Sequence, residues 1–215
     1  MGVEVKFCGL TRAEDARAAA ELGARYAGVI FAGGPRNLDA LRARDVLDGA
    51  GAGVARVGVF GRSDAAAIAK IAREARLDIV QLHADPTVAQ VQAVARATGA
   101  RVWAVVRVSG DLAPDDFQEL WEASDALVLD SKAKGALGGT GVAFDWSAVE
   151  QAARVHARPL VVAGGLTAAN VAQAIETLSA DIVDVSSGVE LSPGIKDHRR
   201  MQEFMDAVGR ASVLR

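Results

Sequence analysis

The sequence predicts a single α/β domain over residues 1–215, folded as a (β/α)8 TIM barrel. Two observations predict this fold. Eight short apolar runs rich in β-branched residues alternate with alanine-rich stretches of helical spacing, from one end of the chain to the other. No linker or shift in composition divides the chain, and 215 residues suit one compact core.

The elements follow one another as strand–helix units. The first strand, "VEVKFC", leads into a helical stretch that Gly23 ends, and Gly99 ends a later one in the same way. The predicted strands are residues 3–8, 26–31, 55–60, 78–83, 101–108, 126–130, 159–164 and 181–187. The predicted helices are residues 12–23, 64–75, 87–99, 115–123, 145–155, 167–178 and 197–209.

An open, doubly wound sheet is the competing fold. Such a sheet usually has fewer units and, when it binds nucleotides, carries a GxGxxG turn after its first strand. Here the first strand runs into "CGLT" instead. Eight units in a row therefore favour closure into a barrel.

Composition narrows the class of protein. The chain is 51% apolar with a net charge of −3, which argues against disorder and against a nucleic-acid-binding surface. The locally basic "RARD" and "DHRR" are interpreted as solvated helix faces. No apolar run approaches the roughly 18 residues of a membrane span, and one cysteine suits a reducing compartment. We expect a cytoplasmic protein, monomer or homodimer, that binds neither nucleic acid nor membrane.

Three glycine-rich segments in the last third of the chain predict a phosphate site: "GGTG", "AGGL" and "SSGVE". Barrels of this kind place reactive groups at the carboxyl ends of the strands and often bind phosphate with the loops after strands 7 and 8. Glycines also permit tight turns without any ligand, which is the alternative interpretation of each loop alone. The candidate phosphate ligands are Gly139, Thr140, Gly141, Gly164, Gly165, Ser186, Ser187 and Gly188.

A thiol and a carboxyl group are the candidate catalytic pair. Cys8 ends the first strand and Asp130 ends the sixth, where a carboxylate after an apolar run is costly unless it caps a helix or does chemistry. Together they can act as a base and an acid. Lys6 has the same strand parity as Cys8, so it either supports the thiolate or forms an ion pair with Asp184.

The other polar residues at strand ends leave alternatives open. His83 lines the pocket or is a satisfied wall residue, and Asp184 orients substrate hydroxyls or balances Lys6. Arg107 contacts substrate or neutralises a carboxylate. His156 and His198 are expected on the surface, and scattered histidines predict no metal site. The tryptophans are expected in the core: Trp103, Trp121 and Trp146.

These motifs, in this order, resemble the phosphoribosylanthranilate isomerase family of tryptophan biosynthesis, and the match runs the whole chain. The family often has Ser-Pro-Arg where this chain has a glycine at residue 34, and Leu-His-Gly where it has an alanine at residue 84. The matching segments are "KFCGLT" in the first strand, "GPR" at 34–36, "QLH" at 81–83, "LDS" to "GGTG" over 129–141, "AGGL" at 163–166, and "DVSSGVE" to "PGIKD" over 184–197.

The resemblance implies an Amadori rearrangement of N-(5′-phosphoribosyl)anthranilate without metal or organic cofactor. Asp130 matches the family's acid, which protonates the furanose ring oxygen, and Cys8 matches its base, which removes the C2′ proton. Arg36 matches the partner of the anthranilate carboxylate, a role that suits a guanidinium. Substrate binding by His83 and Asp184 completes the predicted site.

Two rival functions belong to different classes. One is another phosphosugar barrel, such as the related ProFAR isomerase, which uses two aspartates with one at the end of strand 1; Cys8 argues against it. The other is a barrel that has kept phosphate binding but lost catalysis. The presence of both Cys8 and Asp130 argues against that.

Overall fold

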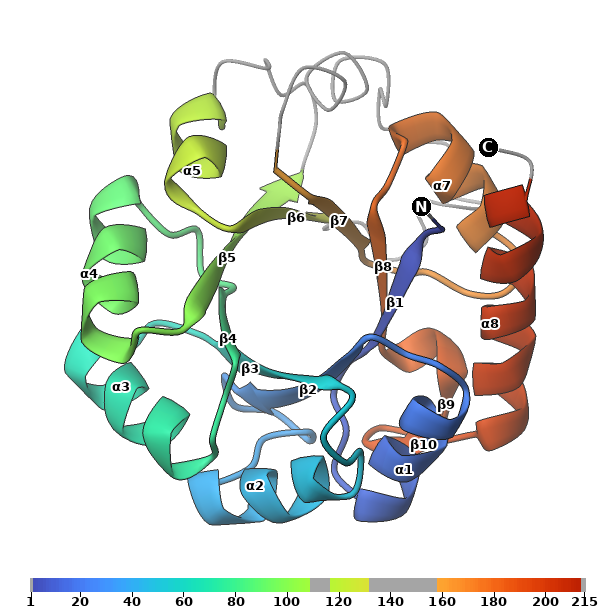
Figure 1. Cartoon of the computed structure of the whole chain (residues 1–215), viewed down its shortest axis with the longest axis horizontal. Coiled ribbons are helices and arrows are strands. Elements are labelled where there is room, and N and C mark those ends of the chain that lie inside the picture. The colour runs from blue at the N-terminus through green and yellow to red at the C-terminus, as the bar shows by residue number, and fades with distance from the viewer. Residues whose placement is uncertain (1, 109–116, 132–157, 214–215) are drawn as a thin grey trace.

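Eight parallel strands close into a barrel in the structure, a computed structural model that describes residues 2–108, 117–131 and 158–213 (Figure 1). Each strand pairs with its neighbours in chain order, and β1 pairs with β8 to close the ring. The predicted single-domain (β/α)8 barrel is confirmed. The strands are β1 (Glu4–Phe7), β2 (Tyr26–Phe31), β3 (Ala55–Phe60), β4 (Ile79–Leu82), β5 (Arg101–Val108), β6 (Ala126–Ser131), β7 (Leu160–Ala163) and β8 (Ile182–Val185).

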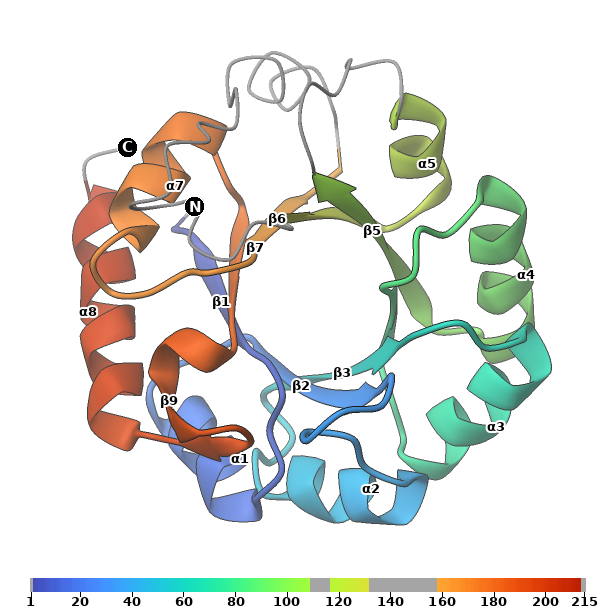
Figure 2. The same ribbon diagram turned by 180° about the vertical axis from the view of Figure 1, so that it is seen from behind.

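Helices surround the barrel on its outside, as the view from behind also shows (Figure 2). Several begin at side-chain caps: Asp39 accepts from the Arg42 N–H at 2.8 Å, and Asp64 accepts from the Ala67 N–H at 2.7 Å. The described helices are α1 (Ala13–Glu21), α2 (Ala40–Asp48), α3 (Ala65–Glu74), α4 (Val88–Thr98), α5 (Gln118–Ala123), α7 (Val171–Leu178) and α8 (His198–Val213).

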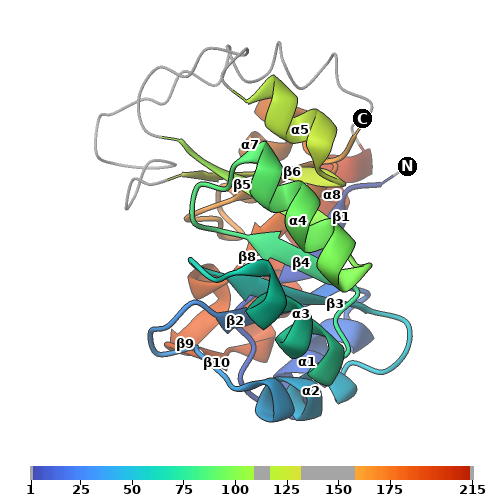
Figure 3. The same cartoon turned by 90° about the vertical axis from the view of Figure 1, so that its left-hand side faces the viewer.

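The chain adds one small element after the last barrel strand. A 3₁₀ turn, η2 (Ser187–Val189), leads into an antiparallel hairpin of β9 (Glu190–Ser192) and β10 (Ile195–Lys196). Seen from the side, this hairpin lies on the side of the molecule opposite the start of β1 (Figure 3). Because the hairpin follows β8, it belongs to the side where the strands end, which is the functional side of such a barrel.

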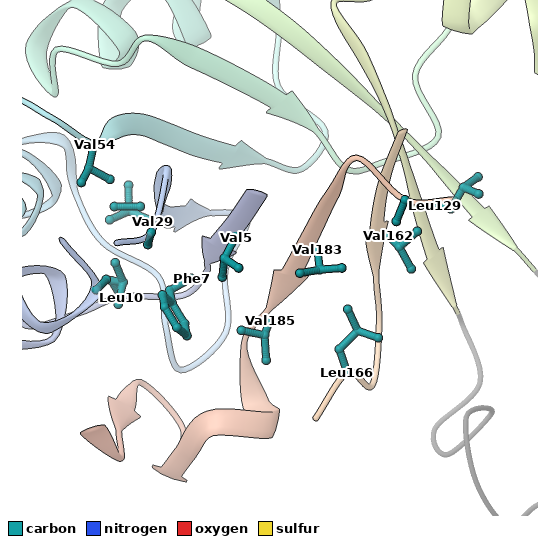
Figure 4. Close-up of a cluster of buried hydrophobic side chains, with 14 of the residues drawn as sticks. Val5, Phe7, Leu10, Val29, Val54, Leu129, Val162, Leu166, Val183 and Val185 are labelled. Atoms are coloured by element: carbon teal, nitrogen blue, oxygen red, sulfur yellow. The ribbon is translucent and has the colours of Figure 1, made fainter. Parts of the chain in front are cut away.

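Alternate residues of the strands divide the core in two. Outward residues such as Val5, Phe7 and Val183 pack under the helices in the larger cluster (Figure 4). Inward residues, Trp103 and Val128 among them, fill the barrel. Trp103 and Trp121 are buried, which confirms their predicted place in the core, whereas Trp146 lies outside the described residues.

The predicted strands agree with the structure to within about two residues at each end. The helix predicted over 167–178 begins only at Val171, because residues 168–170 form a turn in which Asn170 Oδ1 accepts from the Thr167 N–H at 2.7 Å. The helix predicted over 197–209 extends to Val213. The one predicted over 145–155 lies outside the described residues. Over the described part of the chain, no helix combines the length and apolarity that a bilayer crossing needs.

Candidate active site

A cavity of about 290 Å³ opens where the strands end. It gathers residues from strands and loops that are far apart in the sequence, including both members of the predicted catalytic pair. Its lining is Cys8, Ile30, Ala32, Val59, Gln81, His83, Asp130, Ala163, Gly164, Gly165, Leu166, Asp184, Ser186, Ser187 and Gly188.

Cys8 follows β1 directly, and its side chain is buried. Its sulfur and the Cε atom of Lys6 each lie 3.1 Å from the point that a Cβ on Gly28 would occupy. The absence of a side chain on β2 at Gly28 therefore provides the space in which the thiol and the lysine stand together. Burial raises the pKa of Cys8, the nearby charge of Lys6 opposes this rise, and the net direction is upward.

Lys6 is fully buried and forms an ion pair with Asp184, with Nζ 2.6 Å from Oδ2. The two residues are register partners on β1 and β8, so the pair spans the seam that closes the barrel. Burial lowers the pKa of Lys6, but the charges of Asp184 and Cys8 raise it, and the net direction is upward. Lys6 is therefore a fixed positive charge beneath the pocket.

Asp130 stands at the end of β6, with Oδ2 3.5 Å from Nε2 of His83. Burial raises the pKa of Asp130; His83 opposes this rise and the neighbouring Asp184 adds to it. A carboxyl group with a raised pKa holds its proton to higher pH than an ordinary aspartate. That property suits a proton donor.

Three buried polar atoms in this cavity have no hydrogen-bond partner among the described residues: Gln81 Oε1, His83 Nδ1 and Asp184 Oδ1. A buried polar atom without a partner costs about 1–3 kcal/mol, so such atoms are uncommon unless water or a ligand satisfies them. Their grouping in one pocket is typical of a site that binds hydroxyl or amino groups. Gln81 has no predicted role, although its inward parity on β4 is readable from the sequence.

The glycine loops after β7 and β8 face the same cavity. Gly164 and Gly165 have positive φ angles of 90° and 65°, which turn the chain sharply after β7. A Cβ on Gly188 would lie only 1.9 Å from the carbonyl oxygen of Leu166, so the two loops pack tightly together. The predicted phosphate residues 164, 165 and 186–188 are thus brought together, whereas Gly139, Thr140 and Gly141 lie outside the described residues.

Arg36 reaches this end of the barrel but is not among the residues that line the cavity. Its Nε and Nη2 atoms donate to the two carboxylate oxygens of Glu190 at 2.8 and 2.6 Å. Its Cδ lies 2.6 Å from where a Cβ on Gly9 would stand, which places the side chain against the residue that follows Cys8. Glu190, in turn, accepts from the buried Nζ of Lys196 at 2.9 Å. Sequence reasoning identified neither Glu190 nor Lys196, and their shared "SSGVE…PGIKD" segment is the signal that could have found them.

Two other predicted candidates have protein partners. Arg107 pairs with Asp85 through two hydrogen bonds, one of 2.8 Å, so of its two predicted roles the structure supports neutralising a carboxylate. His198 is exposed, as expected, and its Nε2 lies 2.8 Å from the buried Asp15. Within the described ranges, no three His, Cys, Asp or Glu side chains are grouped to hold a metal ion. The predicted absence of a metal stays a prediction.

Comparison with known proteins gives a consistent result. Residues 5–207 match the family model described as N-(5′-phosphoribosyl)anthranilate (PRA) isomerase. A curated relative from Acidithiobacillus ferrooxidans named N-(5′-phosphoribosyl)anthranilate isomerase is 42% identical over 209 residues, which cover 96% of this chain and 97% of the relative.

Solved structures agree with the sequence comparison. The phosphoribosyl anthranilate isomerase of Thermotoga maritima matches with a TM-score of 0.84 and 33% identity over 97% of this chain and 99% of that one. A second structure of such an enzyme, in complex with reduced 1-(o-carboxyphenylamino)-1-deoxyribulose 5-phosphate, matches with a TM-score of 0.82 and 31% identity over the same shares. This chain therefore belongs to the N-(5′-phosphoribosyl)anthranilate isomerase family.

Proposed function

We propose that the chain catalyses the Amadori rearrangement of N-(5′-phosphoribosyl)anthranilate to 1-(2-carboxyphenylamino)-1-deoxyribulose 5-phosphate in tryptophan biosynthesis, with Asp130 as general acid and Cys8 as general base. One observation carries the proposal. The thiol and the carboxyl group line a single cavity that two glycine loops also border. A phosphosugar held by its phosphate at those loops would have its reacting carbons between the two groups.

The acid acts first. Asp130, whose pKa is raised by burial, donates its proton to the furanose ring oxygen. The C1′–O bond breaks as the nitrogen lone pair forms a C=N bond, which gives an open-chain iminium ion. The positive charge makes the neighbouring C2′–H acidic.

The base acts on that second atom. Cys8 removes the C2′ proton as thiolate, the C–H electron pair forms the C1′–C2′ double bond, and the iminium nitrogen is neutralised. The enolamine then tautomerises to the ketose. Burial keeps the pKa of Cys8 above its ordinary value even though Lys6 opposes it, so the thiolate forms in the complex, where the substrate's own cation adds to the charge of Lys6.

The remaining predicted residues bind the rest of the substrate. Asp184 and His83 form hydrogen bonds with sugar hydroxyls, a role supported by the buried polar atom on each that lacks a partner among the described residues. The loops after β7 and β8 bind the phosphate. The sequence also predicts Gly139, Thr140 and Gly141 as phosphate ligands. Arg36, beside Cys8, is assigned the anthranilate carboxylate.

Replacement of the two reacting groups tests the roles. Cys8→Ser and Asp130→Asn should each lower kcat by at least about 100-fold, because one proton transfer typically contributes 10²- to 10⁴-fold. The loss of substrate fluorescence during turnover provides the assay. Binding of the product should change little in either variant. Asp206→Asn, an exposed carboxylate on α8, is the matched control and should turn over normally.

The assay separates the possible errors. Activity of the unmodified protein on the ProFAR substrate alone would replace the proposed substrate. Normal turnover by both variants would refute the acid and base roles while leaving the reaction in place. A protein that binds the product but turns over neither substrate would be the binding module considered above.

A further inference from the structure

The residue assigned to the substrate carboxylate is already neutralised by a carboxylate of the protein. Arg36, the proposed receptor for an anionic group, is already paired with the carboxylate of Glu190 through two hydrogen bonds. A guanidinium and a carboxylate together carry no net charge. A substrate carboxylate approaching this pair would be attracted by Arg36 and repelled by Glu190 over similar distances.

Lys196 changes this balance. Its side chain is fully buried, and its Nζ lies 2.9 Å from the same Glu190 oxygen, Oε1, that accepts from Arg36 Nε. Lys196 also donates to the carbonyl oxygen of Ser186 at 3.0 Å, at the edge of the cavity. Burial lowers the pKa of Lys196, and the hydrogen bond and charge of Glu190 oppose this. With Lys196 protonated, the cluster of Arg36, Glu190 and Lys196 carries one net positive charge next to the pocket.

Glu190 is held firmly in its ionised form. Burial would raise the pKa of Glu190, but hydrogen bonds from Arg36 and Lys196 lower it to about 2. Its Oε1 also accepts from the Gly194 N–H at 3.2 Å, inside the β9–β10 hairpin. The hairpin thus supplies the anion that orients Arg36 and the cation that compensates this anion.

Arg36 keeps donors available for a ligand. A guanidinium has N–H groups on Nε, Nη1 and Nη2, and the bonds to Glu190 use only Nε and one N–H of Nη2. Nη1 makes no hydrogen bond to any residue that the structure describes. The N–H groups of Nη1 and the second N–H of Nη2 can donate to a ligand carboxylate, provided that the net charge of the cluster is positive.

We propose that Lys196 is a specificity-determining positioning residue, which compensates Glu190 so that Arg36, although already paired, still binds the aromatic carboxylate of the substrate. The inference rests on the proposed function, because it concerns the same substrate. It assigns the β9–β10 hairpin a part in substrate selection.

The test compares two ligands that differ only in the carboxylate: reduced 1-(o-carboxyphenylamino)-1-deoxyribulose 5-phosphate and its 1-phenylamino analogue. Their affinities for the full-length protein are measured by calorimetry. Lys196→Met should weaken binding of the carboxylate ligand by about tenfold, because the cluster then has no net charge to attract the carboxylate. Affinity for the analogue should stay within about twofold. Lys70→Met, at an exposed lysine on α3, is the control and should leave both affinities unchanged.

A double variant distinguishes charge compensation by Lys196 from a purely structural role. Glu190→Gln added to Lys196→Met removes the repelling anion and leaves Arg36 as the single cation, so preference for the carboxylate ligand should recover. A purely structural role predicts the opposite, because two buried partners have then been lost. Equal weakening of both ligands by Lys196→Met, or no recovery in the double variant, overturns the inference. If Lys196→Met does not fold, Lys196→Gln makes the same comparison.

Failure of the proposed function has a different signature. In that case the unmodified protein itself would bind the two ligands equally or would not turn over N-(5′-phosphoribosyl)anthranilate. If the unmodified protein turns over this substrate and prefers the carboxylate ligand, only the contribution of Lys196 is at issue. The same set of measurements therefore tests both statements separately.

Discussion

Burial raises the pKa of Cys8, and two neighbours of opposite charge modify this rise. Lys6 lowers the pKa of Cys8, and Asp184 raises it. The same two residues form the 2.6 Å ion pair across the β1–β8 seam. Removing either one exposes the thiol to the unpaired charge of the other, so the pair sets how readily the base forms.

Two substitutions should therefore move the thiol in opposite directions. Lys6→Met should raise the Cys8 pKa by roughly one unit or more, because an opposite charge at this range shifts a pKa by about 1–3 units. Asp184→Asn should lower it. Since Cys8 is the only cysteine, the pH dependence of its alkylation by iodoacetamide measures this pKa directly. Lys6→Arg keeps the cation and should restore the midpoint. If Lys6→Met and Asp184→Asn shifted the Cys8 pKa in the same direction, this explanation would be wrong.

The predictability of the site differs from residue to residue. Cys8, Asp130 and His83 could be found from the sequence because each ends a clear apolar strand, and in a barrel these ends meet. Glu190 and Lys196 could not, because they lie in an irregular segment with no periodic pattern. The partner of Glu190 is also 154 residues away in the sequence, a distance that no local rule bridges.

At the scale of elements, the strands were predictable and the hairpin was not. Buried parallel strands read as continuous apolar runs, so each of the eight could be placed along the chain. β9 and β10 have three and two residues, and Leu191 and Ile195 are exposed, so no buried face creates a pattern. The late start of α7 reflects side-chain hydrogen bonds of Asn170, which compete with helical geometry.

The packing of the β7 and β8 loops should control phosphate affinity. Gly188→Ala would place a Cβ 1.9 Å from the Leu166 carbonyl oxygen, so the loops must separate. Inorganic phosphate should then inhibit at least about tenfold more weakly, the scale of one lost charge-assisted hydrogen bond. Competitive inhibition constants provide the measurement. Gly61→Ala is the matched control, because its Cβ would meet only Ala32 at 3.4 Å. An unchanged inhibition constant in a folded Gly188→Ala protein would refute the packing argument.

At the scale of the whole molecule, charged contacts join the first two strand–helix units of the barrel to the last one. Lys6 meets Asp184 at the closing seam, and Arg36 meets Glu190. The fully buried Asp15 on α1 accepts from the Lys196 N–H at 3.2 Å and contacts His198 at the start of α8. The residues that build the site therefore also join the first and last units of the barrel, so substitutions there affect both activity and stability.

Acid should weaken this connection in a defined pH window. The pKa of Glu190 is about 2 in the folded protein against 4.5 for the free side chain, so its stabilisation is complete above about pH 4.5 and is lost as the pH falls towards 2. Glu190→Gln should be clearly less stable than the unmodified protein at pH 7, and this difference should shrink through that window. Urea unfolding at a series of pH values measures it. Glu203→Gln, at an exposed ion pair with Arg199, should change stability by less than about 1 kcal/mol throughout. A Glu190→Gln difference that is the same at every pH would show that this carboxylate stabilises the fold by packing and not by its charge.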